Sequence, residues 1–258
     1  KDAPGLEVKV ISWNVAGRTS RAVERAERLC AHNPDVVGLQ EVTEKAFSAL
    51  SEGLISCGLK HHVYAKNVVA NPRKRRCVAV FSRWPIQTLT NSISVPYPEL
   101  VLSVMVQQPE LPFEFHCVHI PNGREHGWEK IESFEGVYRG LASTSDIPRI
   151  LCGDFNSPKE ELPTEEIIPW SRRDERWADG ELSVISGLAK FGLEDVYRQL
   201  HGYPPHSFSW DAKNGTRRRF DHIFASRSLR VSDCDYVQDW RQDGLSDHSG
   251  IEAVFSAC

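Results

Sequence analysis

The chain has 258 residues, of which 40% are hydrophobic and 26% are charged, and its formal net charge at pH 7 is −4. These values are typical of a soluble globular protein with one large domain or two small ones. No apolar run is long enough to cross a bilayer, so membrane association is not expected. The acidic balance excludes a protein that binds nucleic acid over its whole surface, because attraction for a polyanion would need a local basic patch or a bound cation.

The seven cysteines are scattered along the chain, and none belongs to a CxxC pair. Several stand in apolar, strand-like runs, where Cys acts as a small hydrophobic residue. We therefore expect reduced thiols in a cytoplasmic protein, or a nuclear one in a eukaryote, with neither a zinc site nor a disulfide framework. No signal peptide is visible, although a chain that begins with Lys1 leaves a removed one open. The cysteines are Cys30, Cys57, Cys77, Cys117, Cys152, Cys234 and Cys258.

Apolar strand-like runs alternate with amphipathic helical runs up to the C-terminus, without a repeat of fixed period or a low-complexity linker. This pattern predicts a single α/β domain over residues 1–258. The predicted strands lie at 6–15, 36–41, 77–82, 100–106, 113–120, 208–210, 220–225 and 250–255, with a further one ending at 150–152. The predicted helices lie at 21–32, 44–54, 128–141 and 182–191. The Glu-rich stretch after Asn156 is expected to be solvated surface.

The stretch at 150–156, ILCGDFN, joins an apolar strand end to a polar turn. Gly153 lets the backbone turn closely, and Asp154 and Asn156 follow it. Residues two apart on a strand point to the same side, so this carboxylate and this amide can face one site. Such a pair suits a metal, a bound water or a phosphate oxygen. Taken alone, the motif fits a strand that ends in an Asx turn equally well.

Other predicted strands also end in polar side chains. Asn14 stands at a strand tip beside a flexible turn, where turn chemistry explains it as well as function does. Glu41 directly follows a buried run, and a carboxylate there is costly to bury unless it is paired or metal-bound. His119 is polar within an apolar run, where a structural histidine is more common than a catalytic one.

Gathered together, these polar residues would form an acidic, oxygen-rich pocket with two imidazoles. In sheet folds, ligands bind where strand ends and loops converge. Oxygen ligands favour Mg²⁺ or Mn²⁺ over zinc, and such an ion would neutralise a phosphate oxygen and stabilise charge in an in-line displacement. The residues of this predicted pocket are Asn14, Glu41, His119, Asp154, Asn156, Asp221, Asp247 and His248.

The same motifs carry a resemblance to a known family. In their order and in their spread over nearly the full length, they resemble the motif series of the endonuclease/exonuclease/phosphatase superfamily. The resemblance implies a four-layer α/β sandwich, in which two mainly antiparallel sheets pack face to face with helices outside. The matching segments are 12–15, 39–41, 119–123, 153–156, 220–222 and 245–248.

Within that superfamily the chain is most similar to the exonuclease III-like apurinic/apyrimidinic (AP) endonucleases. The supporting segments are 121–123 with Lys130 after it, 192–201, and 207–210 followed by 220–222. A His at position 119 is nearer to the DNase I, phosphatase and tyrosyl-DNA phosphodiesterase branches. The departures from the AP endonuclease pattern are His119 for Tyr, Ala16 for Asn, Cys77 for Gly, and Asp211 for a second aromatic residue.

The resemblance also implies roles for the predicted pocket. Glu41 would be the main metal ligand, assisted by Asn14 and Asp247. Asp154 would orient or deprotonate the attacking water. Asn156 would hold the phosphate or that aspartate.

Two histidines and a second aspartate would complete the catalytic set. His248 would contact the scissile phosphate, with its tautomer fixed by Asp247 or a neighbouring carboxylate. His119 would donate a hydrogen bond or a proton to the transition state or the leaving oxygen, and Asp221 would support a histidine or a second metal.

Basic and aromatic residues would contact DNA. A basic run is as often a solvated loop as a phosphate-backbone contact, and both readings stay open here. Trp210 would stack on a base or fill the gap left by a missing one. The residues predicted to bind DNA are Arg73, Lys74, Arg75, Arg76, Asn122, Trp210, Arg217, Arg218 and Arg219.

The leading hypothesis is therefore a monomeric, Mg²⁺- or Mn²⁺-dependent phosphodiesterase that acts on DNA, as a repair-type AP endonuclease or 3′ exonuclease. The nearest alternative keeps the chemistry and changes the substrate: a DNase I-like nuclease, a tyrosyl-DNA phosphodiesterase, or a lipid, sugar or nucleotide phosphatase. A third hypothesis is a non-catalytic binding module. The full set of polar residues argues against it, because a site without catalytic activity needs no buried charges.

Overall fold

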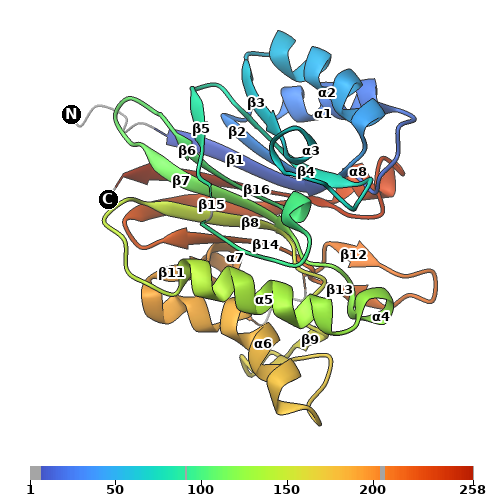
Figure 1. The fold of residues 1–258 in the computed structure, drawn as a ribbon, viewed down its shortest axis with the longest axis vertical. Helices are drawn as coiled ribbons and strands as arrows, with labels where there is room; N and C mark the ends of the chain where they lie inside the picture. The colour runs from blue at the N-terminus through green and yellow to red at the C-terminus, as the bar shows by residue number, and fades with distance from the viewer. Residues whose placement is uncertain (1–6, 91, 204–206, 258) are drawn as a thin grey trace.

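The computed structural model of the chain describes residues 7–90, 92–203 and 207–257. Leu6 and Cys258, for which a strand start and a reduced thiol are predicted, lie outside these ranges. Two six-stranded sheets pack face to face, and helices cover the outer face of each (Figure 1). The predicted four-layer α/β sandwich is confirmed.

The first sheet has the strand order β15-β16-β1-β2-β4-β3. Within it β1 and β2 are parallel, and the other neighbouring strands are antiparallel. Helices α1 (Ala22–Ala31) and α2 (Glu44–Ser56) lie on its outer face. The strands are β1 (Glu7–Asn14), β2 (Val36–Val42), β3 (His61–Tyr64), β4 (Cys77–Ser82), β15 (Leu229–Val237) and β16 (Gly250–Ala257).

The second sheet has the order β11-β14-β8-β7-β6-β5. Here β7 and β8 are parallel and the rest antiparallel. Helices α5 (Trp128–Leu141) and α6 (Glu175–Ile185) cover its outer face. The strands are β5 (Ile86–Thr88), β6 (Val101–Val106), β7 (Phe113–His119), β8 (Arg149–Asp154), β11 (Leu193–Asp195) and β14 (Asp221–Ser226).

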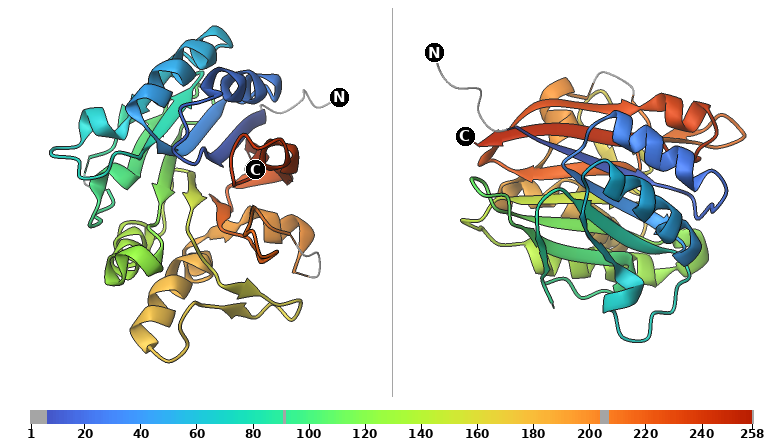
Figure 2. Two further views of the ribbon diagram at one scale, coloured as in Figure 1. Left: turned by 90° about the vertical axis from the view of Figure 1, so that its right-hand side faces the viewer. Right: turned by 90° about the horizontal axis from the view of Figure 1, so that it is seen from above.

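Shorter elements complete the fold. Two hairpins, β9 (Glu160–Glu161) with β10 (Ile167–Ile168) and β12 (Trp210–Asp211) with β13 (Arg217–Arg218), stand outside the two sheets (Figure 2). The short helices are α3 (Ala65–Val68), η1 (Pro98–Leu100), α4 (Gly123–His126), η2 (Gly187–Phe191), α7 (Val196–His201) and α8 (Gln238–Gln242).

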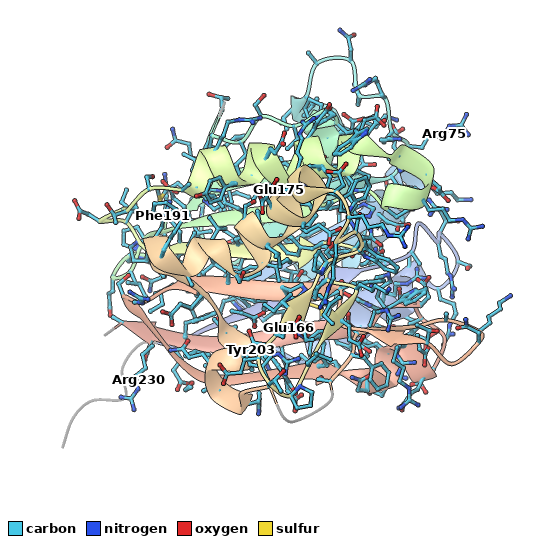
Figure 3. The ribbon with its side chains drawn as sticks, turned by 90° about the horizontal axis from the view of Figure 1, so that it is seen from below. Arg75, Glu166, Glu175, Phe191, Tyr203 and Arg230 are labelled. Atoms are coloured by element: carbon cyan, nitrogen blue, oxygen red, sulfur yellow. A yellow bond between two sulfur atoms is a disulfide. The ribbon has the colours of Figure 1, made fainter. Side chains whose placement is uncertain are left out.

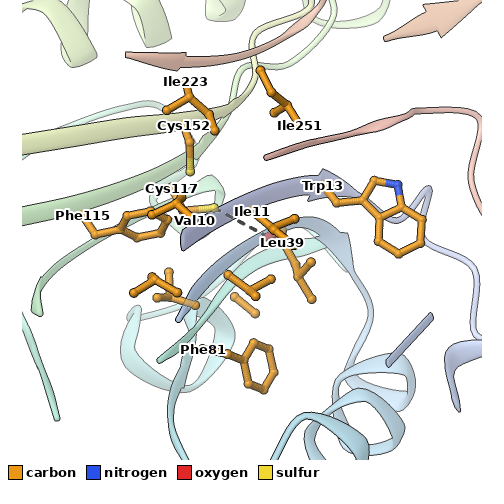
Figure 4. Close-up of a cluster of buried hydrophobic side chains, with 14 of the residues drawn as sticks. Val10, Ile11, Trp13, Leu39, Phe81, Phe115, Cys117, Cys152, Ile223 and Ile251 are labelled. Atoms are coloured by element: carbon orange, nitrogen blue, oxygen red, sulfur yellow. Dashed lines mark hydrogen bonds between the residues drawn. The ribbon is translucent and has the colours of Figure 1, made fainter. Parts of the chain in front are cut away.

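The core lies between the inner faces of the two sheets, where side chains of β1, β2 and β4 meet those of β7, β8 and β14 (Figure 4). A Cβ atom on Gly38 would lie 3.1 Å from the sulfur atoms of both Cys117 and Cys152, so the glycine lets the sheets approach closely. This packing fixes the relative position of strand ends that come from different sheets.

The predicted strands and helices are largely present, with two shifts that have local causes. The helix predicted at 182–191 is divided: its first residues are the last turn of α6, and 187–191 form the 3-10 helix η2. Helix α6 begins at Glu175, because Asp174 caps its N-terminus by accepting the Trp177 N–H at 3.0 Å. The strand predicted at 208–210 begins only at Trp210 and forms the β12–β13 hairpin. None of the helices in the described ranges is long and apolar enough to cross a membrane.

The prediction that all cysteines are reduced is wrong for one pair. Cys30 on α1 and Cys57 after α2 form a disulfide between Cα atoms 5.9 Å apart, although 27 residues separate them in sequence. The packing of α1 on α2 brings the two together, which scattered spacing did not reveal. The expectation of a cytoplasmic location rested on fully reduced cysteines and so loses that support. The four cysteines that remain free among the described residues are buried.

Candidate active site

Most of the polar side chains predicted to share a site come together at one end of the sandwich, where strand ends of both sheets meet. Asn14, the last residue of β1, is buried, and its Nδ2 donates to Glu41 Oε1 at 3.2 Å and to Asp154 Oδ2 at 2.8 Å. Glu41 belongs to the first sheet and Asp154 to the second. A single amide therefore joins the two carboxylates across the interface between the sheets.

Glu41 is presented by an irregular backbone. Its φ is 54°, and the pairing of β2 with β4 shifts register between Leu39 and Val42. Such a bulge redirects a side chain at a local cost that functional sites often carry. Although burial raises the pKa of Glu41, His119, Asn14 and Arg76 together lower it below its usual value, so the carboxylate stays ionised.

Asp154 lies at the end of β8, directly after Gly153, where a residue with a side chain would not fit. Gly153 has a φ of 149°, and a Cβ there would lie 1.8 Å from the Val118 carbonyl oxygen. The carboxylate is fully buried, and its Oδ1 accepts the Asn156 N–H at 2.9 Å. Burial raises the pKa of Asp154, and the nearby His248 only partly opposes this effect.

Asn156 is not on the strand, contrary to the prediction that it faces the site from the same side of a strand as Asp154. The strand ends at Asp154, and Asn156 has a left-handed φ of 48°. Its Nδ2 donates to the Ile120 carbonyl oxygen at 2.9 Å. Asn156 therefore fixes the loop beside Asp154, to which its backbone N–H is bonded.

His248 is held by an aspartate from another strand. Its Nδ1 lies 2.7 Å from Asp221 Oδ2, and its Nε2 lies 3.8 Å from Asp154 Oδ2. Burial alone would lower the pKa of His248, but Asp221 and Asp154 outweigh it and raise the pKa to about 10. The imidazole is thus positively charged at neutral pH and has an Nε2–H available on the side of Asp154.

His119 lies between the two carboxylates that Asn14 joins. Its Nε2 is 3.8 Å from Glu41 Oε1 and 3.7 Å from Asp154 Oδ2. Glu41, His119 and Asp154 form one cluster with metal-ligand spacing, and Asp154, Asp221 and His248 form a second. The first, with the adjacent amide of Asn14, offers the oxygen-rich donor set that suits Mg²⁺ or Mn²⁺.

Asp247, which is also predicted to hold the metal, lies close enough to His248 for its charge to help raise the pKa of that histidine. Its side chain is exposed, whereas those of Ser246 and His248 on either side are buried. Neither metal-like cluster includes it. Asp221 is the carboxylate that contacts His248 Nδ1.

The basic run at 73–76 is split between several partners. Arg73 and Lys74 both contact the ring of Tyr97, and their backbone N–H groups donate to the buried Glu99. The side chain of Arg75 is exposed and projects from the surface (Figure 3). Arg76 instead turns to the site, where its Nη1 donates to Glu41 Oε2 at 2.6 Å.

The prediction that Arg219 binds DNA is wrong. Its guanidinium is buried and pairs with Glu161 at 2.7 Å and with Asp195 at 2.6 Å. Arg198 joins the same Glu161 at 2.7 Å, and Asp195 also holds His222. Glu161 was expected at the solvated surface, and its position here is a second correction. Carboxylates distant in sequence neutralise Arg219, so the local run of arginines does not indicate that Arg219 is buried.

The remaining predicted DNA contacts lie at the rim. Trp210 is half-buried, packs its ring 5.3 Å from that of Phe220, and pairs with His248 in an isolated β-bridge. Arg217 is exposed and Arg218 half-buried on β13. Asn122 caps α4 by accepting the Glu125 N–H at 2.9 Å.

Two further residues, to which the sequence assigns no role in the site, lie beside Asp154. The exposed Trp170 and the buried Lys130 both donate to the Asn156 carbonyl oxygen, at 2.9 and 2.8 Å. Burial lowers the pKa of Lys130, although the Glu181 carboxylate at 3.2 Å opposes this effect. The only sequence signal for Trp170 is a large aromatic residue at the boundary between the apolar residues 167–169 and the polar stretch 171–176.

Two helix-covered sheets with carboxylates, an amide and imidazoles meeting at one end are the arrangement of DNase I-like phosphoester hydrolases. The model of the Endonuclease/Exonuclease/phosphatase family matches residues 11–248, and the chain belongs to this family. The predicted superfamily is thereby confirmed, and with it the prediction of a metal-dependent phosphoester hydrolase.

Known proteins resemble the chain over almost its whole length. Exodeoxyribonuclease III of Haemophilus influenzae is 25% identical over 279 residues, which cover 96% of this chain and 100% of the relative. The structure of an AP endonuclease from Archaeoglobus fulgidus has a TM-score of 0.73 at 20% identity, covering 96% and 99% of the two chains. That of D. rerio TDP2 complexed with single-strand DNA product has a TM-score of 0.69 at 20% identity, covering 97% and 99%.

Proposed function

We propose that this protein is a Mg²⁺- or Mn²⁺-dependent phosphodiesterase that cleaves DNA, as a repair-type AP endonuclease or 3′ exonuclease. One observation carries the proposal: Asp154 is buried beside a charged His248 and is joined by Asn14 to Glu41. Each of these residues comes from a different strand end or loop. The name of the exodeoxyribonuclease III relative and that of the AP endonuclease neighbour support DNA as the substrate.

The cation would be held by Glu41 and Asp154, with Asn14 adjacent. When bound, it would supply positive charge that polarises the phosphate ester. The residues themselves explain why it is needed: Glu41 and Asp154 lie close together, and burial already raises the pKa of Asp154. Arg76 and the charged His248 offset only part of the negative charge of Glu41, Asp154 and Asp221, and buried carboxylates are costly without full compensation.

Asp154 is the proposed acceptor of the proton from the attacking water. A raised pKa makes a carboxylate a stronger base, and the Asn156 N–H fixes its Oδ1 in one orientation. Its Oδ2 is the atom that lies towards both histidines.

His248 is the proposed partner of the phosphoryl oxygens. Asp221 holds Nδ1, which leaves the Nε2–H free to donate to the developing negative charge. Preorganised donors of this kind contribute strongly to transition-state stabilisation. His119 is 13% exposed next to the same carboxylates and is the proposed donor to the leaving oxygen.

A tyrosyl-DNA phosphodiesterase is the second candidate. It is favoured by His119 at the position where AP endonucleases carry Tyr, and by the likeness to TDP2. The two candidates share the metal site and differ in the group that leaves the phosphate.

The test is a panel of substrates, each assayed with Mg²⁺ and with a chelator: abasic duplex, intact duplex, single strand, 5′-tyrosyl DNA and inositol phosphates. We expect metal-dependent cleavage of abasic or 3′-ended duplex above all others. Preference for the 5′-tyrosyl end would establish the second candidate. Cleavage of inositol phosphates without cleavage of any DNA, or turnover that persists in the chelator, would refute the proposal.

A monomer is part of the proposal, in which the residues of one chain are enough to form the site. Sedimentation velocity at the concentration of the activity assay would detect a dimer. Activity that rises with dimer formation would contradict a monomeric active unit.

A further inference from the structure

The two short hairpins outside the main sheets enclose a cavity beside the active site. It has a volume of about 70 Å³ and lies between the start of the β9–β10 hairpin and the β12–β13 hairpin. Pro158, Tyr203 and Ser207 form part of its wall. The positively charged side chains of Lys159, Arg217 and Arg218 also line it. The catalytic proposal uses none of these groups.

The cavity carries an excess of positive charge. Arg198 and Arg219 also line it, but Glu161 pairs with both. Lys159, Arg217 and Arg218 have no ion pair within the described ranges, and only the exposed Glu160 opposes them. The lining therefore suits an anion.

Arg218 carries a buried hydrogen-bond donor that faces no acceptor among the described residues. This donor is its Nε, whereas its Nη1 donates to the Arg217 carbonyl oxygen at 3.0 Å. A buried donor without an acceptor costs free energy. An oxygen-rich anion in the cavity would supply the acceptor.

The cavity lies close along the chain to Asp154. Pro158 is part of its wall and follows shortly after Asn156, whose backbone N–H is bonded to Asp154. Four residues from Asp154 to Pro158 can span at most about 14 Å. A single nucleic-acid strand is long enough to contact Asp154 and the cavity together.

Trp170 adds a flat apolar surface at the same place. Its side chain is 43% exposed, yet its indole N–H is fixed on the Asn156 carbonyl oxygen at 2.9 Å. The Arg218 guanidinium lies 5.9 Å from the ring, and the ring of Phe220 lies 6.3 Å away. An exposed indole held in one orientation is well suited to stack on a base.

We propose that the cavity and Trp170 form a nucleotide subsite next to the scissile phosphate. Lys159, Arg217 and Arg218 bind the phosphate of the flanking nucleotide, and Trp170 stacks on its base. This inference rests on the proposed function and specifies how the enzyme positions its strand.

The first experiment measures binding without turnover. Fluorescence anisotropy of labelled single-stranded and abasic duplex oligonucleotides, in EDTA, gives a Kd for each variant. Arg218→Ala should weaken binding roughly tenfold, the size expected from one lost charge-assisted hydrogen bond. Lys159→Ala should act in the same direction, and because Lys159 is exposed its removal leaves the core untouched.

Arg230→Ala is the matched control for loss of one positive charge. Arg230 is exposed and pairs with Ser256, at the end of β16 far from His248. In Figure 3 it projects from the opposite side of the molecule to Arg75. For Trp170→Ala, which should also weaken binding roughly tenfold, the control is Trp128→Ala, because Trp128 is equally exposed at 43% but packs against Trp177.

The second experiment locates the phosphate. Oligonucleotides with a single neutral methylphosphonate at each linkage are bound by the wild type and by Arg218→Ala. We expect the wild type to lose affinity at one linkage beside the scissile one, and Arg218→Ala to show no further loss there. An equal loss in both proteins would overturn the assignment of that phosphate to the cavity.

The outcomes separate the two proposals. A wild type that cleaves DNA, with Arg218→Ala and Trp170→Ala no weaker in binding than their controls, would overturn the subsite alone. A wild type that neither binds nor cleaves DNA would overturn the proposed function and the subsite with it. Circular dichroism melts of each variant ensure that a lower affinity is not the result of unfolding.

Discussion

Two buried clusters of charged side chains lie close together in this protein, and they differ in how their charges are balanced. The active-site cluster contains Glu41, Asp154, Asp221, His119 and His248. The arginine network contains Glu161, Asp195, Arg198, Arg219 and His222. Both draw their members from distant parts of the chain, so distance in sequence does not distinguish them.

The difference lies in how the carboxylates are neutralised. In the arginine network, burial raises the pKa of Glu161, but Arg219 and Arg198 outweigh it and lower the pKa to about 2. In the active-site cluster Asp154 pairs with no guanidinium: its side-chain partners are the Asn14 amide at 2.8 Å and two imidazoles at 3.7 and 3.8 Å, and its pKa is raised. A cluster that is neutral by itself serves the structure, whereas one with excess negative charge is suited to a cation and to proton transfer.

The largest effect should come from Asp154→Asn. We expect turnover to fall by roughly 10²–10⁴-fold, because the amide cannot accept the proton of the attacking water. The fold should stay intact, since an amide oxygen can still accept the Asn156 N–H. Metal-replete kinetics together with a thermal melt would check both parts, and wild-type turnover in the variant would refute the role of Asp154.

Arg219→Ala should show the reverse behaviour. Removing the guanidinium leaves Glu161 and Asp195 buried without their main partner, and breaking such a pair costs about 3–5 kcal/mol. Denaturant unfolding would measure the loss, with Arg230→Ala as the control for a surface arginine. Full stability combined with weakened DNA binding would restore the rejected role of Arg219 at the DNA surface.

The contrast also explains what the sequence could predict. Asn14, Glu41 and Asp154 each follow an apolar run. The pattern that identifies a buried strand also shows where the strand ends, and therefore which polar residue stands at that end of the sheet. The site residues could therefore be found one by one. Their order along the chain then indicated the family and its sandwich.

Long-range pairing is what the sequence could not predict. Arg219 stands in a run of three arginines, and only the fold shows that Glu161 and Asp195 reach it while Arg217 stays exposed. Asp247 has the residue type of a ligand, and only the fold shows that its side chain is exposed beside the buried His248. The Cys30–Cys57 disulfide depends on how two helices pack, which residue spacing does not encode.

Acid should weaken the arginine network. The pKa of Glu161 is lowered from its usual 4.5 to about 2 in the folded protein, so its stabilising contribution is complete above pH 4.5 and is lost as the pH falls towards 2. Unfolding free energies measured at several pH values between 6 and 2 should decline across this window. In Glu161→Gln the decline should be smaller, and an unchanged decline would assign acid sensitivity to other carboxylates.

Glu41→Gln should have the smallest effect, because Glu41 combines features of both clusters. It belongs to the active site, yet Arg76 already pairs with its Oε2 at 2.6 Å, as the guanidiniums do in the arginine network. Loss of its charge should raise the Mg²⁺ requirement by roughly tenfold, equivalent to about 1.4 kcal/mol of binding free energy. A Mg²⁺ titration of the hydrolysis rate and calorimetry with Mn²⁺ would measure the shift, with the exposed Glu44→Gln as control. If the variant instead lost stability and kept its metal affinity, Glu41 would belong with the structural carboxylates, and the metal would have to be held by Asp154 and its histidine neighbours.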